Sequence, residues 1–265
     1  MPSVERQGIG IFFEDVGAGL PVVLGHSFLC SGAMWAPQVG ALAERYRVVN
    51  VDFRGHGRSG NADAPFSLYD LVTDVVAVLD HLRIERAVWA GLSIGGMVAL
   101  RAALVAPERV SALILLDTHA GAETAHKKLK YRLMALGTKT FGIRPFLPAI
   151  VPLMFGRTTR RTKPALVDEW RARFAAVHAP SMLRTLDALI RRDSVVPRLS
   201  EIRVPSLVIV GEQDVSLPPA YSSELAAGLK SSAFVEVPAS GHLVALEQPE
   251  AVTGAMLRFL DSIAR

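Results

Sequence analysis

Short apolar runs alternate with longer segments of helical periodicity along most of the chain. Runs of strand length cover residues 8–14, 21–26, 47–52, 86–90, 110–117, 204–211 and 233–237. Between them, apolar residues such as Trp35, Val39 and Leu42 recur at helical spacing, and a last helix is expected over residues 249–263. The run 110–117 is almost entirely apolar, as expected of a strand covered on both faces. This alternation predicts an α/β fold with a mostly parallel central sheet flanked by helices.

One helix start carries its own signal. Ser67 and Asp70 have the spacing of a capping box, in which each side chain accepts a hydrogen bond from the other residue's backbone N–H. An apolar stripe follows at helical spacing, formed by Leu68, Leu71, Val72, Val75, Val76, Leu79 and Leu82. We therefore expect an amphipathic helix that begins directly after Ser67.

The alternation stops between residues 118 and 200. This stretch has helical character, many basic residues and six prolines, and the strand–helix pattern resumes after it. An insertion at the C-terminal end of a strand lies over the crevice in which open α/β sheets bind ligands. We therefore expect a core domain formed by residues 1–119 and 201–265, with a helical cap or lid over residues 120–200.

A Gly-x-Ser-x-Gly motif, Gly91 to Gly95 with Ser93 at its centre, lies between an apolar strand and a helix. This is the context of a nucleophile elbow, a sharp turn that exposes a serine hydroxyl. The serine then lies at a helix N-terminus, where free N–H groups and the helix dipole favour developing negative charge. The motif predicts Ser93 as a catalytic nucleophile.

A serine nucleophile needs a base, and the base needs an orienting acid. The elbow predicts the chain order Ser, Asp or Glu, His, with each residue on a loop after a late strand. Asp214 and His242 follow two successive predicted strands, so we predict a triad of Ser93, Asp214 and His242. Asp117 also ends a strand and is the competing candidate for the acid.

The oxyanion hole is expected to use the backbone N–H of Ile94, the residue after the nucleophile. A second N–H is expected from residues 26–29, with Phe28 preferred and Ser27 as the alternative. Candidate residues for lining the pocket are His26, Ser27, His119 and Met97.

Other motifs are expected to be structural. Gly55-x-Gly57-x-x-Gly60 matches a dinucleotide fingerprint by letter, but turn residues follow it where a helix would have to begin. Cys30 is expected to be a small apolar filler. Because no motif for a metal or nucleotide is visible, we expect neither a metal nor another cofactor.

Charge is unevenly distributed along the 265 residues. Residues 120–200 contain 16 Lys and Arg but 5 Asp and Glu, a net charge of +11, whereas the remainder has 13 basic and 20 acidic residues, a net charge of −7. Such a segment is either a solvated helix face or an attractor for an anionic substrate. The modest total of +4 and the absence of a recognised module argue against nucleic-acid binding.

The single cysteine excludes an intrachain disulfide. The first residues lack the pattern of a signal peptide, and no apolar run has the length of a membrane span. A cytoplasmic protein without a membrane partner is the expectation. The sequence does not indicate an oligomeric state.

Taken together, these residues resemble the α/β-hydrolase superfamily over nearly the whole chain outside 120–200. The elbow, the loop 52–59, Asp214 and the Ser240-Gly241-His242 sequence carry the likeness, although His26-Ser27 stands where that family usually has His-Gly. Further residues resemble 3-oxoadipate enol-lactonases: Ser27-Phe28, Met34-Trp35-x-Pro37-Gln38, Arg54-Gly55-His56-Gly57 and the segment 91–97. The resemblance implies an α/β-hydrolase fold with the cap inserted after the sixth strand.

The expected activity is cofactor-independent hydrolysis of a small carboxylic ester or lactone, with an anionic substrate suggested by the basic cap. A C–C bond hydrolase and a perhydrolase could use the same three residues. A ligand receptor that retains the hydrolase fold is the alternative from another class. Dehalogenases and epoxide hydrolases are disfavoured, because those relatives have Asp where this chain has Ser93.

Overall fold

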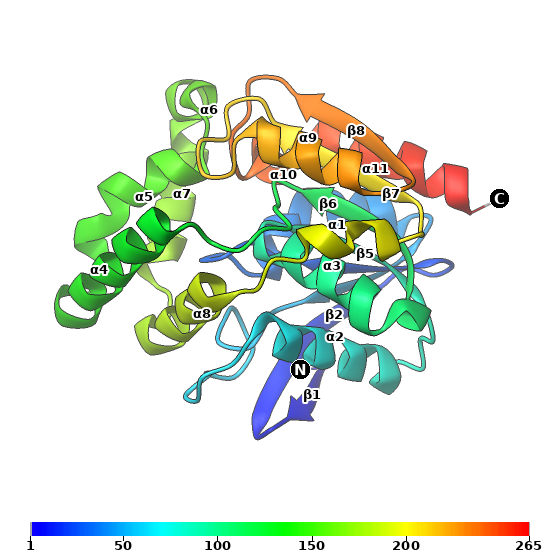
Figure 1. The fold of residues 1–265 in the computed structure, drawn as a ribbon, viewed down its shortest axis with the longest axis horizontal. Coiled ribbons are helices and arrows are strands. Elements are labelled where there is room, and N and C mark those ends of the chain that lie inside the picture. The colour runs from blue at the N-terminus through cyan, green and yellow to red at the C-terminus, as the bar shows by residue number, and fades with distance from the viewer. Residues whose placement is uncertain (1, 265) are drawn as a thin grey trace.

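The protein, described over residues 2–264 by a computed structural model, is built on one eight-stranded sheet with helices on both faces (Figure 1). The strand order is β1-β2-β4-β3-β5-β6-β7-β8. Strands β1 and β2 pair antiparallel, β2 pairs antiparallel with β4, and all later pairs are parallel. The strands are β1 (Ser3–Arg6), β2 (Ile9–Val16), β3 (Pro21–Gly25), β4 (Arg47–Val51), β5 (Ala87–Leu92), β6 (Val110–Leu116), β7 (Ser206–Gly211) and β8 (Ser232–Val237).

Helices lie between the parallel strands and after the last strand. They are α1 (Ala36–Ala43), α2 (Leu68–His81), α3 (Ile94–Val105), α4 (Ala125–Phe141), α5 (Leu147–Met154), α6 (Arg157–Thr162), α7 (Pro164–Ala175), α8 (Ala179–Arg191), α9 (Pro219–Gly228), α10 (Val244–Glu247) and α11 (Pro249–Ile263). Short 3₁₀ turns are η1 (Gly32–Trp35), η2 (Pro107–Arg109), η3 (Arg144–Phe146) and η4 (Val196–Glu201). The predicted α/β-hydrolase fold is confirmed in its sheet and flanking helices.

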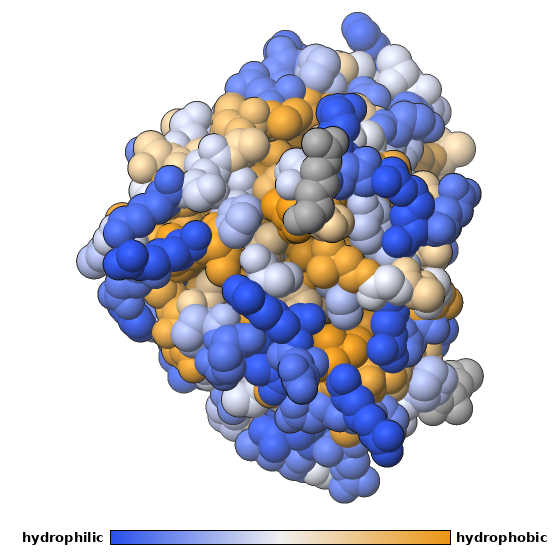
Figure 2. Space-filling view, turned by 90° about the vertical axis from the view of Figure 1, so that its right-hand side faces the viewer, coloured by the Kyte–Doolittle hydropathy of each residue, from blue (hydrophilic) through white to orange (hydrophobic). Residues whose placement is uncertain are grey.

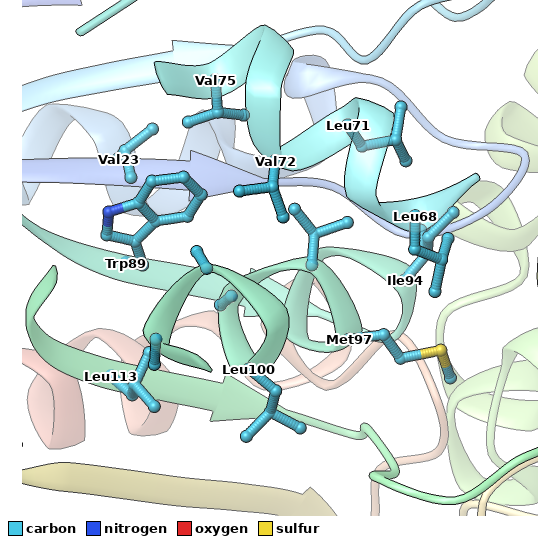
Figure 3. Packing of buried hydrophobic residues seen from close by; sticks show 14 of the residues in the cluster. Val23, Leu68, Leu71, Val72, Val75, Trp89, Ile94, Met97, Leu100 and Leu113 are labelled. Carbon is cyan, nitrogen blue, oxygen red and sulfur yellow. The ribbon is translucent and has the colours of Figure 1, made fainter. Parts of the chain in front are cut away.

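Two apolar clusters lie on the two faces of the sheet, because successive strand side chains point to opposite faces. One contains residues of α2, α3 and α9, and the other contains residues of α1, α10 and α11. Figure 3 shows the first cluster, in which Val72 and Val75 of α2 point toward Val23 and Trp89 of the sheet. The sheet is therefore a rigid platform whose strand ends hold loops in fixed positions.

The amphipathic helix predicted after Ser67 is α2. Its capping box is present: the Ser67 hydroxyl accepts from the Asp70 N–H, and the Asp70 carboxylate accepts from the Ser67 N–H at 2.7 Å. The last helix has the predicted bounds, Pro249–Ile263. Strand β1 was not predicted. It is four residues long and half exposed, so its sequence carries almost no hydrophobic signal.

Helices α4 to α8 follow β6 and precede β7, so they fall within residues 120–200. Figure 1 shows them grouped at the left of the molecule, beside the sheet, with the C-terminus at the opposite side. Figure 2 shows that opposite side, where hydrophilic and hydrophobic residues are interspersed. Within residues 2–264, no helix is both long and apolar enough to cross a bilayer.

Candidate active site

Ser93 occupies a strained turn between β5 and α3. Its backbone has φ +56° and ψ −113°, a region that a residue with a side chain rarely adopts. The surroundings hold this conformation: the Ser93 N–H donates to the Leu116 carbonyl at 2.9 Å, and the Thr118 hydroxyl donates to the Ser93 carbonyl at 2.7 Å. The side chain is therefore presented at the C-terminal edge of the sheet and at the N-terminus of a twelve-residue helix.

The glycines of the motif allow α3 to lie against the strands. A Cβ atom on Gly91 would lie 2.1 Å from the Gly95 carbonyl carbon, and a Cβ atom on Gly95 would lie 2.1 Å from the Gly25 carbonyl oxygen. Both contacts involve backbone atoms that cannot rotate away. The Gly-x-Ser-x-Gly spacing is thus a packing requirement of the turn that carries Ser93.

Asp214 and His242 lie on the loops after β7 and β8, and the two side chains meet. The His242 Nδ1 lies 2.8 Å from Asp214 Oδ2, and both residues are buried. Asp214 Oδ1 accepts from the backbone N–H groups of Ser216 and Leu217 at 2.8 and 3.0 Å. Because the carboxylate only accepts, Nδ1 of His242 is the protonated nitrogen and Nε2 is left as an acceptor.

Asp117, the competing acid, does not contact His242 in this way. Its Oδ1 accepts from the Gly211 N–H at 2.8 Å, and its buried Oδ2 has no hydrogen-bond partner among residues 2–264. Burial, followed by the charge of Asp214, raises the pKa of Asp117 well above its ordinary value. The geometry therefore brings Asp214, rather than Asp117, to the imidazole.

Ser93 and His242 line the same cavity, whose volume is about 130 Å³. One wall consists of core residues, and the other consists of residues from the segment between β6 and β7. The lining is mainly apolar: Phe28, Leu29, Met97, Met134, Ile143, Ile150, Leu153, Met154, Met182, Leu186, Leu189 and Leu217. An apolar cavity with a few convergent polar groups is the usual form of a small-molecule site.

Within residues 2–264, neither the Phe28 N–H, in the cavity lining, nor the Ile94 N–H, next to Ser93, has an acceptor. The Ser27 N–H, in contrast, donates to the Met34 sulfur at 3.2 Å. Of the two N–H groups considered for the loop after β3, the Phe28 group is therefore the free one.

Comparison with known proteins adds the family. The sequence profile of the alpha/beta hydrolase fold matches residues 21–249, which is most of the chain. This chain belongs to the α/β hydrolase family. The match includes all three predicted triad positions and the whole segment between β6 and β7.

Relatives of this α/β hydrolase carry several activities in their names. A protein of Azorhizobium caulinodans, provisionally named a carbamate hydrolase, is 30% identical over 99% of both chains. The 3-oxoadipate enol-lactonase 2 of Acinetobacter baylyi is 30% identical, over 84% of this chain and 82% of its own. A solved thermophilic esterase from Thermogutta terrifontis is 30% identical with a TM-score of 0.93, over 99% of this chain and 97% of its own. The resemblance to enol-lactonases is thus confirmed.

Among the four candidate pocket residues of this α/β hydrolase, Ser27 and Met97 lie in the cavity lining. His26 does not: it is fully buried, its Nδ1 lies 2.8 Å from the Ser27 carbonyl, and its Nε2 accepts from the Phe53 N–H. His119 also lies outside the lining, because its ring stacks on Tyr221 at 4.2 Å between centroids. Both histidines therefore have packing roles that their positions at strand ends did not indicate.

The sequence did not point to an ion pair in the cavity lining of the hydrolase. Arg192 Nη1 donates to Glu123 Oε2 at 3.1 Å, and Arg192 Nε donates to the Gly121 carbonyl at 2.9 Å. Both side chains are less than one-tenth exposed. The two residues are far apart in sequence and share no motif, so only the fold brings them together.

Glu247 was also missed. Its buried carboxylate accepts from the Gly241 N–H, next to His242, and from the Gly156 N–H, each at 2.9 Å. Its own carbonyl accepts from the Lys163 ammonium at 2.7 Å. Glu247 therefore joins the His242 loop of the hydrolase core to the helical segment.

Two other positions have structural surroundings. Cys30 is buried, and this burial raises the pKa of its thiol, which disfavours the nucleophilic thiolate. The glycine-rich loop after β4 closes around Asp52, whose carboxylate accepts from the Gly32 and Arg58 N–H groups at 2.6 and 2.8 Å. The next helix begins only at Leu68, so the loop lacks the helix that a dinucleotide fingerprint needs.

Proposed function

We propose that this α/β hydrolase cleaves carboxylic esters or lactones through Ser93, His242 and Asp214. The observation that carries the proposal is that Ser93 and His242 line one cavity while His242 is paired with Asp214. The esterase and enol-lactonase relatives support ester or lactone hydrolysis in general. The roles of Ser93, His242 and Asp214 are proposed from the geometry of the site.

In the proposed mechanism, Ser93 Oγ attacks the substrate carbonyl while His242 Nε2 takes the hydroxyl proton. Asp214 holds the imidazole tautomer and stabilises the imidazolium that forms. His242 then protonates the leaving alkoxide, which leaves an acyl group on Ser93. A water molecule, deprotonated by His242, attacks the acyl-enzyme and releases the carboxylic acid.

The negative charge that develops on the carbonyl oxygen needs preorganised donors. We propose the N–H groups of Phe28 and Ile94 for this role, because neither has an acceptor of its own within residues 2–264. Loss of one such donor typically costs about 10²–10³-fold in kcat.

The cavity favours a substrate with an apolar body. The Lys, Arg, Asp and Glu side chains in its lining are Arg192 and Glu123, and these two pair with each other without net charge. We propose an ester or lactone with an apolar acyl or alcohol part. If the substrate is anionic, its attraction arises from the basic surface of the helical segment rather than from the cavity wall.

We further propose that residues 120–200 form a cap over the cavity and that residues 1–119 and 201–265 form the core. Tyr131 and Met134 of α4 and Met182 of α8 belong to the lining. Lys127 Nζ of α4 donates at 3.1 Å to the carbonyl of Ser216, a core residue in the cavity lining. Substrate choice would then depend on this segment.

Steady-state hydrolysis by wild type and Ser93→Ala tests the proposal. The substrates are p-nitrophenyl acetate, a neutral lactone, a carboxylate-bearing enol lactone and an aryl carbamate. We expect turnover of an ester or a lactone, and a loss in Ser93→Ala on the scale of about 10⁶ in kcat. Ester turnover by the folded variant within tenfold of wild type would contradict the assignment of Ser93.

The acid is tested by a matched pair of variants. Asp214→Asn should reduce kcat by about 10⁴, because the amide favours the wrong imidazole tautomer. Asp117→Asn should have a far smaller effect, since Asp117 contacts the Gly211 N–H instead. The reverse order would make Asp117 the acid.

Acylation of the wild-type protein that stops after one equivalent would instead favour the alternative of a ligand receptor that retains the hydrolase fold.

A further inference from the structure

Helix α4 has two opposite apolar faces. Tyr131, Met134 and Thr138 line the cavity. With 3.6 residues per turn, Leu129, Leu133 and Leu136 lie on the other side of the helix. These three residues, here called the leucine face, are 60%, 62% and 63% exposed, and Phe141 at the end of the helix is 73% exposed. No core packing accounts for the leucine face.

This concentration is unusual for the molecule. The other large hydrophobic residues exposed within residues 2–264 lie on different elements: Val16, Val105, Val196, Val215 and Phe234. Figure 1 shows α4 at the outer left of the molecule, with no described element on its far side. Single exposed apolar residues need no explanation, whereas a row along one helix indicates a binding surface.

Basic residues flank the leucine face on both sides. Helical spacing places Lys128, Arg132 and Lys139 along one flank and Lys130 along the other. Helix α4 contains no acidic residue. Two copies of this helix packed face to face would therefore bring like charges together, which disfavours a symmetric dimer through α4. An anionic occupant is complementary.

We propose that the leucine face and its basic flanks dock this protein on anionic lipid surfaces. An apolar face bordered by Lys and Arg on a helix that lies in the interface plane is how proteins bind such surfaces without spanning them. The lack of a membrane span led to the expectation of no membrane partner, and this proposal departs from that expectation. Docking here would place the cavity, on the other face of α4, close to lipophilic molecules.

Co-sedimentation with vesicles tests this proposal independently of hydrolysis. Wild type is mixed with vesicles of phosphatidylcholine alone or with phosphatidylglycerol, at low and high salt. We expect binding to the anionic vesicles that weakens with salt, and little binding to phosphatidylcholine. Absence of binding, or equal binding to both lipids, overturns the proposal.

Two variants separate the contributions of the leucine face and of the basic residues to vesicle binding. The first replaces the leucine face with serine, and the second replaces Lys128, Lys130 and Arg132 with Gln. Both should bind anionic vesicles at least tenfold more weakly, and the second should also lose the salt dependence. The matched control carries exposed apolar residues changed elsewhere, Val105→Ser and Phe234→Ser, and should bind like wild type. A serine variant that folds by circular dichroism and binds like wild type overturns the proposal.

Other occupants give different results. In one case, poly-glutamate abolishes vesicle binding, and the serine variant binds poly-glutamate as well as wild type does. These two results together would indicate that the occupant is an acidic protein, and they would overturn lipid docking. A wild-type dimer in sedimentation velocity that dissociates in the serine variant would indicate a second copy and would also overturn it.

Discussion

His26 and His56 lie buried beside the loops that carry the proposed oxyanion donor, with 4.9 Å between their ring centroids. Both nitrogens of His26 are engaged, one near the Ser27 carbonyl and one accepting from the Phe53 N–H. If Nε2 of His26 also carried a proton, that proton would point at the Phe53 N–H. These hydrogen bonds therefore fit only the neutral imidazole. Burial lowers the pKa of His26 to about 4 and that of His56 to about 3.

These lowered pKa values predict acid sensitivity of the fold. Below about pH 6.5 the unfolded chain binds protons that the folded chain does not, so the free energy of unfolding falls as the pH falls. For His26 this loss runs from about pH 6.5 down to its folded pKa of about 4 and reaches about 3 kcal/mol. Urea unfolding at a series of pH values measures it.

His26→Asn removes one of the two titrating groups. We expect the pH dependence of stability between about pH 6 and pH 4 to become shallower by about 1.4 kcal/mol per pH unit, whatever its effect at neutral pH. His126→Asn, on the exposed surface of α4, is the control for the removal of a histidine. An unaltered slope in the His26 variant would show that this ring is already protonated in the folded protein.

At the scale of elements, Glu247 predicts coupling between the His242 loop and α6. Replacement by Ala leaves the Gly241 and Gly156 N–H groups buried without an acceptor, at about 1–3 kcal/mol each. We expect Glu247→Ala to lower the free energy of unfolding by several kcal/mol and kcat by more than tenfold, because Gly241 adjoins His242. Thermal unfolding and ester turnover are the two measurements.

A conservative change distinguishes positioning from mere stability. Glu247→Gln keeps one acceptor oxygen, so it should recover part of both losses, while KM stays close to the wild-type value. Glu250→Ala, an exposed change at the start of α11, controls for the lost charge. If Glu247→Ala destabilises the protein but kcat below the unfolding temperature is normal, Glu247 does not position the His242 loop.

Elements with local signals were predictable from sequence. The capping residues Ser67 and Asp70 fixed the start of α2, and the glycines around Ser93 indicated the turn from β5 to α3. The proximity of Asp214 and His242 was predictable because parallel strands end at one edge of the sheet, so residues that follow successive strands lie near each other. Strand β1 and the bounds of the helices between β6 and β7 had no comparable signal.

Contacts between distant segments could not be read in this way. The Arg192–Glu123 pair, the Glu247 contacts and the cavity wall from α4 depend on how the helical segment lies on the core. Ser27 lies in the cavity lining, whereas its sequence neighbour His26 is buried outside the lining with both ring nitrogens engaged. Burial of this kind is a property of packing and not of local sequence.

At the scale of the whole molecule, charge is separated between the two parts of the chain. Residues 120–200 have a net charge of +11, and the remainder has a net charge of −7. Such a separation produces a field that extends beyond contact distance at low ionic strength and is screened within about 10 Å at 0.1 M salt. Because the ion pair in the cavity lining is neutral, any preference for anionic substrates must come from this field.

The field predicts that KM for an anionic ester rises severalfold with salt, whereas KM for a neutral ester of the same size stays constant. Neutralising Arg160 and Arg161, both exposed on α6, with Gln should reproduce part of the salt effect at low ionic strength. Neutralising Lys230 and Arg258, exposed basic residues outside the helical segment, removes the same charge from the other part and should have a smaller effect. Equal effects of the two pairs would mean that total charge matters and its position does not. A KM for the anionic ester that does not change with salt would refute electrostatic steering by the helical segment. Lipid docking would then be the one proposed role of its basic residues.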